Sequence, residues 1–184
     1  MVPSVGWGLE WAPRGRGMEL YLVRHAIAEE RDPKRWPGDR ERPLSEAGIA
    51  KFRESAGGLA RWVPRVDAIW SSRLRRAWQT AEILSHVTGW PAPAELEALE
   101  PGHPAAQVLR EVVTRWRGER LALVGHAPGL DELAALALFG DSSAQPFALR
   151  KGGIACLAIE EPFQPGQASL TWLATPKLLR ALAR

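Results

Sequence analysis

Cysteine is nearly absent from the 184-residue chain, which contains only Cys156. One cysteine excludes a disulfide within the chain. The apolar residues around it, 154–159, indicate a small buried side chain rather than a reactive thiol. A reducing compartment fits this composition, and we expect the protein to work in the cytoplasm.

Long apolar runs, a signal peptide and a metal-ligand pattern are also missing. No run approaches the ~20 apolar residues of a membrane span, and the start of the chain lacks the apolar region of a signal peptide. There is no His-x₃-His pair and no carboxylate cluster after a strand, so no ligand set for zinc or a two-metal centre is visible. We therefore expect no membrane contact, no metal and no cofactor.

Lysine is scarce: only four of the 24 basic residues are lysine and the rest are arginine. Arginine presents a planar fork that suits phosphate and carboxylate groups, and it stays charged. The formal net charge of +3 is modest. No groove-reading element or interleaved aromatic pattern accompanies it, so we do not expect a nucleic-acid partner.

Length and composition predict one domain preceded by a short extension. A chain of this length with 46% hydrophobic residues can build one substantial core but is short for two. Residues 1–17 show no periodicity, and Met18, a candidate start of translation, directly precedes the first predicted strand. We interpret residues 1–17 as an N-terminal extension and residues 18–184 as the domain, the alternative being a short arm packed through Trp7 and Trp11.

The remaining chain alternates short apolar strands with amphipathic helices. Such alternation predicts a doubly wound, three-layer α/β/α domain with a mostly parallel sheet. A hairpin near the C-terminus adds an antiparallel edge. The predicted strands cover residues 20–23, 68–70, 94–96, 121–125, 154–159 and 169–173. The predicted helices cover residues 46–63, 74–87, 104–116, 129–139 and 176–182.

Two of the four histidines follow directly after buried strands. Arg24 and His25 come after the apolar run 20–23, and His126 comes after the run 121–125. Open α/β sheets bind their ligands at the carboxyl ends of the strands. Neighbouring strands lie roughly 4.8 Å apart, so if these two strands are adjacent, both imidazoles converge on one crevice. A lone strand-end histidine, in contrast, is more often structural.

A basic cluster opens the second predicted helix, at Arg73, Arg75 and Arg76. The helix macrodipole disfavours cations at this end. An anion held between the helix start and an arginine fork would resolve that conflict, which indicates a phosphate site. The alternative is that these arginines extend into water.

Four segments that contain these residues resemble the histidine phosphatase superfamily, which is phosphoglycerate mutase-like. They are residues 22–25 (LVRH), 42–48 (RPLSEAG), 72–81 (SRLRRAWQTA) and 124–128 (VGHAP). The short chain and the Arg-His-Ala form, where Arg-His-Gly is more usual, resemble the SixA-type phosphohistidine phosphatase branch. The resemblance covers about residues 18–175 and implies a phosphoglycerate mutase-like fold.

The same resemblance implies the roles of the site residues. It implies a covalent phosphohistidine intermediate on His25 and a phosphate pocket formed by Arg24, Arg76 and His126, without a metal. Arg76 rather than Arg75 is the functional arginine, because the family pattern places Ala, one further residue and Gln-Thr after it. Arg75 lies some 100° away around a helix, and we expect it to face solvent. A His126 that stays protonated could hydrogen-bond a phosphoryl oxygen.

The substrate class follows from where the chain departs from its relatives. Relatives that act on phosphate esters place an acidic proton donor before the third helix, where this chain offers Glu97 and Glu100, with His103 behind them. Glu100 is our candidate proton donor, although a solvated loop carboxylate fits each position equally well. The esterases also tend to carry Asn where this chain has Arg31.

Phosphoramidates need less acid assistance than esters, because imidazole leaves more easily than an alkoxide. We therefore expect hydrolysis of phosphohistidine on a phosphorylated protein. A phosphatase of small phosphate monoesters, such as a sugar or nucleotide phosphate, is the alternative. A noncatalytic phosphate-binding module is the third possibility.

Overall fold

The computed structural model describes residues 17–145 and 147–184, and within these ranges the chain forms one six-stranded sheet and five α-helices. The strands are β1 (Gly17–Arg24), β2 (Ala68–Ser71), β3 (Pro93–Glu95), β4 (Arg120–Gly125), β5 (Ile154–Glu160) and β6 (Ser169–Ala174). The helices are α1 (Glu46–Trp62), α2 (Arg75–Thr88), α3 (Ala105–Arg115), α4 (Gly129–Phe139) and α5 (Pro176–Leu182). Short 3₁₀ turns occur at Asp39–Glu41 and Glu97–Leu99.

The sheet has the strand order β3-β2-β4-β1-β5-β6. Strands β3, β2, β4 and β1 pair in parallel, whereas β5 runs antiparallel to both of its neighbours. The prediction of a mostly parallel sheet with an antiparallel C-terminal edge is therefore confirmed. Parallel strands need a crossover connection, which the helices of this chain provide. Strands β5 and β6 are joined by a hairpin and therefore run antiparallel.

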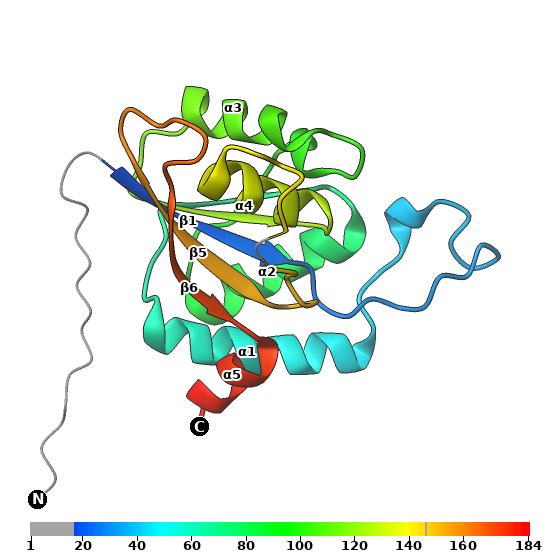
Figure 1. Cartoon of the computed structure of the whole chain (residues 1–184). Helices are drawn as coiled ribbons and strands as arrows, with labels where there is room; N and C mark the ends of the chain where they lie inside the picture. The colour runs from blue at the N-terminus through cyan, green and yellow to red at the C-terminus, as the bar shows by residue number, and fades with distance from the viewer. Residues whose placement is uncertain (1–16, 146) are drawn as a thin grey trace, which may run out of the picture.

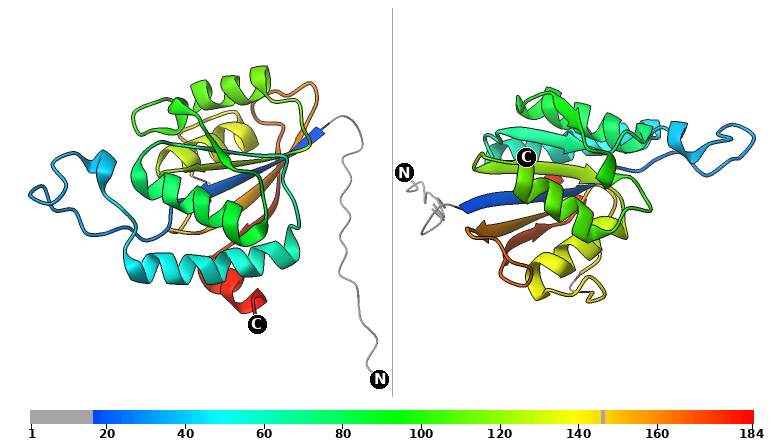
Figure 2. Two further views of the ribbon diagram at one scale, coloured as in Figure 1. Left: turned by 180° about the vertical axis from the view of Figure 1, so that it is seen from behind. Right: turned by 90° about the horizontal axis from the view of Figure 1, so that it is seen from above.

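Helices cover both faces of the sheet, which gives the predicted three layers (Figures 1 and 2). Successive side chains of β1 point to opposite faces, so Tyr21 and Val23 pack with α1, α2 and α5, while Leu20 and Leu22 pack with α3 and α4. Residues 20–23 of β1 and 121–124 of β4 are therefore apolar and buried without interruption, as expected for a parallel sheet covered on both sides.

The predicted helix ends are close to the observed ones. Ser45 caps α1 by accepting a hydrogen bond from the backbone N–H of Gly48, and Gly89 ends α2 in the left-handed conformation with φ 75°. Pro104, expected as the first residue of α3, is instead its N-cap. Residues 1–16 of the predicted extension lie outside the described residues, and Gly17 belongs to β1.

A long loop joins the C-terminal end of β1 to α1 and projects from the body of the domain (Figure 1). Its two arms are held together by an isolated bridge between Ala28 and Leu44 and by a hydrogen bond from the Glu29 N–H to the Pro43 carbonyl (2.9 Å). The loop therefore starts and returns at the strand end that bears His25.

No helix in the described part of the chain is long and apolar enough to span a bilayer.

Helices α1 and α5 pack closely because Gly58 has no side chain. A Cβ atom at Gly58 would collide with the backbone carbonyl of Leu179, whereas a Cβ atom at the adjacent Gly57 would meet nothing within 4 Å. The two glycines therefore provide a matched pair, one at a helix contact and one in open space.

We predict that Gly58→Ala lowers the free energy of unfolding by about 1–3 kcal/mol, because the contact becomes overpacked. Gly57→Ala should raise it by up to about 1 kcal/mol, since alanine favours the helix. Denaturant unfolding of both variants measures the difference. Equal effects of the two substitutions would contradict the close packing of α5 on α1.

Candidate active site

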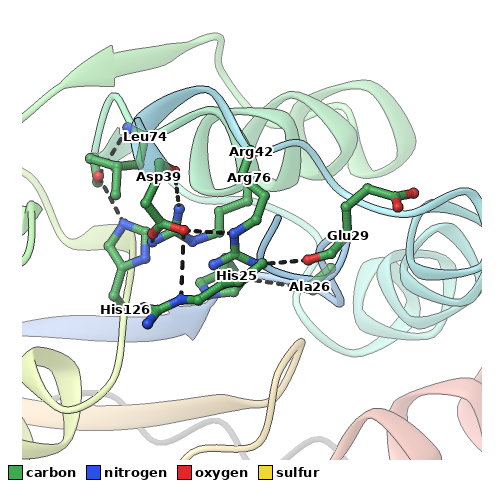
Figure 3. Close-up of polar contacts among 10 residues, drawn as sticks. His25, Ala26, Glu29, Asp39, Arg42, Leu74, Arg76 and His126 are labelled. Carbon is green, nitrogen blue, oxygen red and sulfur yellow. Dashed lines mark hydrogen bonds and ion pairs between the residues drawn. The ribbon is translucent and has the colours of Figure 1, made fainter. Parts of the chain in front are cut away.

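The site is built where β1 and β4 end side by side. The two strands pair in parallel with Arg24 opposite Gly125, so His25 and His126 leave the sheet at the same level. The ring centroids of the two histidines lie 5.1 Å apart, and both residues are buried. The structure thus brings together the two histidines that the sequence places after strands (Figure 3).

His25 has one ring nitrogen engaged and the other free to react. Its Nδ1 lies 2.7 Å from the carbonyl oxygen of Ala26. A carbonyl only accepts hydrogen bonds, so Nδ1 must carry the proton, which leaves the lone pair on Nε2. Burial lowers the pKa of His25 to about 3, and the positive charges of Arg76 and Arg24 act in the same direction. At neutral pH, Nε2 is therefore an unprotonated nucleophile.

His126 is held by Ser72, which follows β2. Its Nε2 lies 2.9 Å from the Ser72 hydroxyl, and that hydroxyl also accepts a hydrogen bond from the Leu74 N–H (3.2 Å). Burial lowers the pKa of His126 to about 2, with the neighbouring His25 acting in the same direction. The ring of His126 is therefore neutral at pH 7 in this structure, and its protonation against a bound phosphoryl group stays a prediction.

The same hydrogen bonds indicate which nitrogen of His126 carries its proton. Among the described residues the Ser72 O–H has no acceptor other than Nε2 of His126, so it donates to Nε2 and the proton of His126 lies on Nδ1. Within the described chain, Nδ1 is buried and has no hydrogen-bond partner. A neutral His126 therefore still offers an N–H to an anion.

Two arginines border the histidines, and each keeps a donor unpaired. Arg24 donates from Nη1 to the Leu149 carbonyl (2.6 Å), and Arg76, in the first turn of α2, lies buried. In the described chain, the buried Nε atoms of both arginines lack a hydrogen-bond partner. Arg75 is exposed, as expected. The site thus contains three unpaired N–H donors, which suit the oxygens of a phosphoryl group.

Asp39, from the loop after β1, is a site residue that the sequence analysis missed. Its carboxylate lies 3.0 Å from Nη2 of Arg76 and accepts a hydrogen bond from Nε of the buried Arg42 (2.7 Å), and its carbonyl accepts from Nη1 of Arg76 (2.8 Å). The hydrogen bond from Arg42 lowers the pKa of Asp39, and the charge of Arg76 acts in the same direction. Asp39 therefore balances two buried cations, and the terminal nitrogens of Arg76 are shared with it (Figure 3).

Helix α2 also fixes the loop to the strand end. Thr80 lies one turn after Arg76 and accepts a hydrogen bond from the Ala26 N–H (3.1 Å). The adjacent Gln79 accepts one from the Leu44 N–H (2.8 Å) at the other arm of the loop. The first two turns of α2 thus contribute Arg76 to the site and hold both arms of the loop through Gln79 and Thr80.

The three candidate proton donors are separated in the structure. Glu97 is exposed, whereas Glu100 and His103 line a cavity of about 350 Å³ that also reaches His126. Both carboxylate oxygens of Glu100 accept hydrogen bonds from Arg40, at 2.7 and 2.9 Å. Glu100 is therefore near the site, but it must leave Arg40 before it can act as an acid.

No group of three or more His, Cys, Asp or Glu side chains in residues 17–145 and 147–184 could hold a metal ion. Arg24 and Arg76 supply positive charge close to both histidines.

Comparison with known proteins places these residues in a family context. The family model of the histidine phosphatase superfamily (branch 1) matches residues 20–100. An uncharacterized protein of Picosynechococcus is 36% identical over 140 residues, which cover 74% of this chain and 82% of that protein.

Solved structures share the fold at lower identity. The protein histidine phosphatase SixA complexed with tungstate has a TM-score of 0.75 and 21% identity, over 87% of this chain and 98% of SixA. A mycobacterial glucosyl-3-phosphoglycerate phosphatase has a TM-score of 0.64 and 21% identity, over 87% of this chain and all (100%) of that chain. The same architecture therefore occurs in phosphatases of proteins and of small molecules.

The lowered pKa values of the two histidines predict a dependence of stability on pH. Both lie below the ordinary 6.5, at about 3 for His25 and about 2 for His126. Between pH 6.5 and 3 the unfolded chain binds protons that the folded chain does not, so stability must fall as the pH falls. Each buried imidazole contributes up to about 1.4 kcal/mol per pH unit in this window.

Denaturant unfolding at several pH values tests this. From pH 6 to pH 4 the free energy of unfolding of the wild type should fall more steeply than that of His25→Asn/His126→Asn. Parallel curves for the two proteins would show that these imidazoles titrate normally in the folded state.

Proposed function

This chain belongs to the histidine phosphatase superfamily, and we propose that it hydrolyses phosphohistidine through a covalent phosphohistidine intermediate on His25. The observation that carries the proposal is the pair of buried, neutral imidazoles with Arg24 and Arg76 close by. The SixA structure with the same fold is that of a protein histidine phosphatase, which supports this substrate class.

In the first step, Nε2 of His25 attacks the phosphorus atom in line with the P–N bond of the substrate. The unpaired Nε–H groups of Arg24 and Arg76 and the Nδ1–H of His126 hydrogen-bond the phosphoryl oxygens, whose charge otherwise repels the nucleophile. As the N–P bond forms, positive charge develops on the His25 ring. The Ala26 carbonyl at Nδ1 stabilises that charge.

The leaving group is the substrate imidazole, which takes the bonding electrons of the P–N bond. With a proton on its other ring nitrogen it leaves as neutral imidazole, so no strong acid is needed. Water then attacks the phosphorus of phosphorylated His25 and releases inorganic phosphate and the free Nε2. This two-step route suits a site in which the candidate proton donor, Glu100, is bound to Arg40 and the Asp39 carboxylate is bound to Arg76 and Arg42.

A small-molecule phosphate monoester is the second candidate substrate. It is favoured by the position of Glu100 and His103 in the cavity next to His126, where a leaving alkoxide would need a proton. In that case Glu100 would exchange its bond to Arg40 for one to the leaving oxygen. The glucosyl-3-phosphoglycerate phosphatase of the same fold supports this alternative.

A turnover panel distinguishes the two. We expect phosphohistidine to be hydrolysed much faster than sugar or nucleotide monophosphates, in the presence or absence of EDTA. Acid-labile, base-stable phosphate should be trapped on the protein by rapid base quench, and His25→Ala should abolish both the trapped phosphate and turnover. Glu100→Gln should leave phosphohistidine hydrolysis within about threefold, since it lies outside the proposed proton path.

Other outcomes lead to different conclusions. Preference for a monoester together with a large loss in Glu100→Gln would support the second candidate. Wild-type turnover in His25→Ala would refute the covalent intermediate. Loss of activity in EDTA with recovery on adding a divalent ion would show that the reaction depends on a metal.

The two adjacent arginines of α2 test the phosphate site. Arg76→Lys keeps the charge but cannot reproduce the planar fork that spans Asp39 and a phosphoryl oxygen. Losing one preorganised donor to a transition-state oxyanion costs about 10²–10³-fold in rate, so we expect a loss of this order in kcat. Arg75→Lys, at an exposed position, should be nearly silent. Similar kinetics of the two variants would show that Arg76 does not bind the transferred group.

A further inference from the structure

A second hollow, separate from the cavity beside His126, opens on the other side of the site and is strongly basic. It has a volume of about 570 Å³ and lies between α1, the start of α5 and the residues that precede β5. We call it the basic groove. Among the described residues that line it there are five cations and no carboxylate: Arg24, Lys51, Arg150, Lys151 and Arg180.

A tight turn joins the wall of the groove to the catalytic centre. Residues 150–153 form this turn, with a hydrogen bond from the Gly153 N–H to the Arg150 carbonyl (2.7 Å) and Gly152 at φ 77°. Positive φ at the third position is typical of a type II turn and favours glycine. The Gly152 N–H lies 3.0 Å from the carbonyls of both Arg24 and His25.

The backbone of the turn is thus bonded to the two residues that begin the active site. Because Gly152 and Gly153 are buried, the exposed side chains of Arg150 and Lys151 are the parts of the turn that reach the groove. Lys151 is near enough for its charge to act on His25. A molecule bound in the groove would therefore contact Arg24 and Ala26, the two residues that flank His25 in the chain.

The cations of the groove are poorly neutralised within the protein. Arg180 has an acidic partner, Glu54, at 3.9 Å. Among the described residues, Lys51, Arg150 and Lys151 have no carboxylate within 4.0 Å. Repulsion between these like charges disfavours the folded state. The same charges create a positive field that attracts anions.

We propose that the basic groove docks an acidic segment of a phosphorylated protein and so presents its phosphohistidine to His25. This rests on the proposed function. The groove is open to solvent and its Lys51, Arg150 and Lys151 side chains are exposed, which suits several carboxylates spread along a protein surface. A small anion is usually held by buried, preorganised donors instead, like those around His126.

The probes are two synthetic peptides of equal length, each with one phosphohistidine, flanked by glutamates in one peptide and by glutamines in the other. At low ionic strength we expect the wild type to hydrolyse the acidic peptide with a kcat/KM about tenfold higher, because the field steers it to the site. The preference should shrink as salt is added. Phosphohistidine as the free amino acid serves as the reference substrate.

The variant Lys51→Glu/Arg150→Glu should remove this preference and leave hydrolysis of free phosphohistidine within about twofold, since neither side chain contacts the reacting atoms. The matched control is Arg53→Glu/Arg110→Glu, which changes the net charge equally at exposed positions outside the groove. The control should keep the preference. Lys51→Gln/Arg150→Gln repeats the test with milder substitutions if the charge-reversed protein does not fold.

Four results would contradict either the docking proposal or the proposed function, and each result identifies which of the two is wrong. If the wild type hydrolyses free phosphohistidine but treats both peptides alike, docking is wrong and the proposed function stands. If it hydrolyses no phosphohistidine substrate, the proposed function is wrong. If the control variant loses the preference equally, the net charge acts rather than the groove. If Lys51→Glu/Arg150→Glu lowers kcat/KM for sugar bisphosphates but not for sugar monophosphates or the acidic peptide, docking is wrong and the groove holds a second phosphate of a small molecule.

Discussion

The active site depends on one constraint, the in-register parallel pairing of β1 with β4. Because Arg24 pairs with Gly125, the residues that follow each strand emerge at the same height, and the His25 N–H bonds the Gly125 carbonyl at 3.0 Å. A shift by one residue would turn one histidine to the opposite face of the sheet. Both faces of these strands are packed by apolar side chains, so the cores on either side of the sheet also fix the distance between the imidazoles.

Burial then sets the chemistry of that pair. The apolar surroundings and the nearby arginines disfavour imidazolium, so both rings stay neutral and His25 retains a nucleophilic lone pair. The same burial makes unpaired cations costly, and Asp39 offsets part of that cost by bonding Arg76 and Arg42. A phosphoryl group entering the site meets donors that are already held in place, and the nearby Asp39 carboxylate is already paired with Arg76 and Arg42.

Local patterns in the sequence predicted the parts of the site that sit on regular elements. His25 and His126 follow apolar strands, and the choice of Arg76 over Arg75 came from the family pattern and agrees with their burial. Asp39 was missed because its contacts with Arg76 span 37 residues and arise from a loop without periodicity. The pairing of Arg40 with Glu100, 60 residues away, is equally invisible to local patterns. Polar loop residues carry no signal of their position until the fold brings distant segments together.

The loop after β1 and the turn before β5 both lie against the end of β1 and supply the side chains that surround it. The end of β1 contributes Arg24 and His25, and we expect the residues that distinguish one phosphorylated substrate from another to lie on the segments tied to it. On one side, Glu100, which is paired with Arg40, lines a cavity next to His126. On the other, the turn at residues 150–153 is bonded to the backbone of Arg24 and His25 and brings Lys151 beside them. Because the turn is fixed to the strand by backbone hydrogen bonds, its exposed side chains can change without moving His25, so we expect substrate choice and the proposed phosphoryl transfer to depend on separate residues.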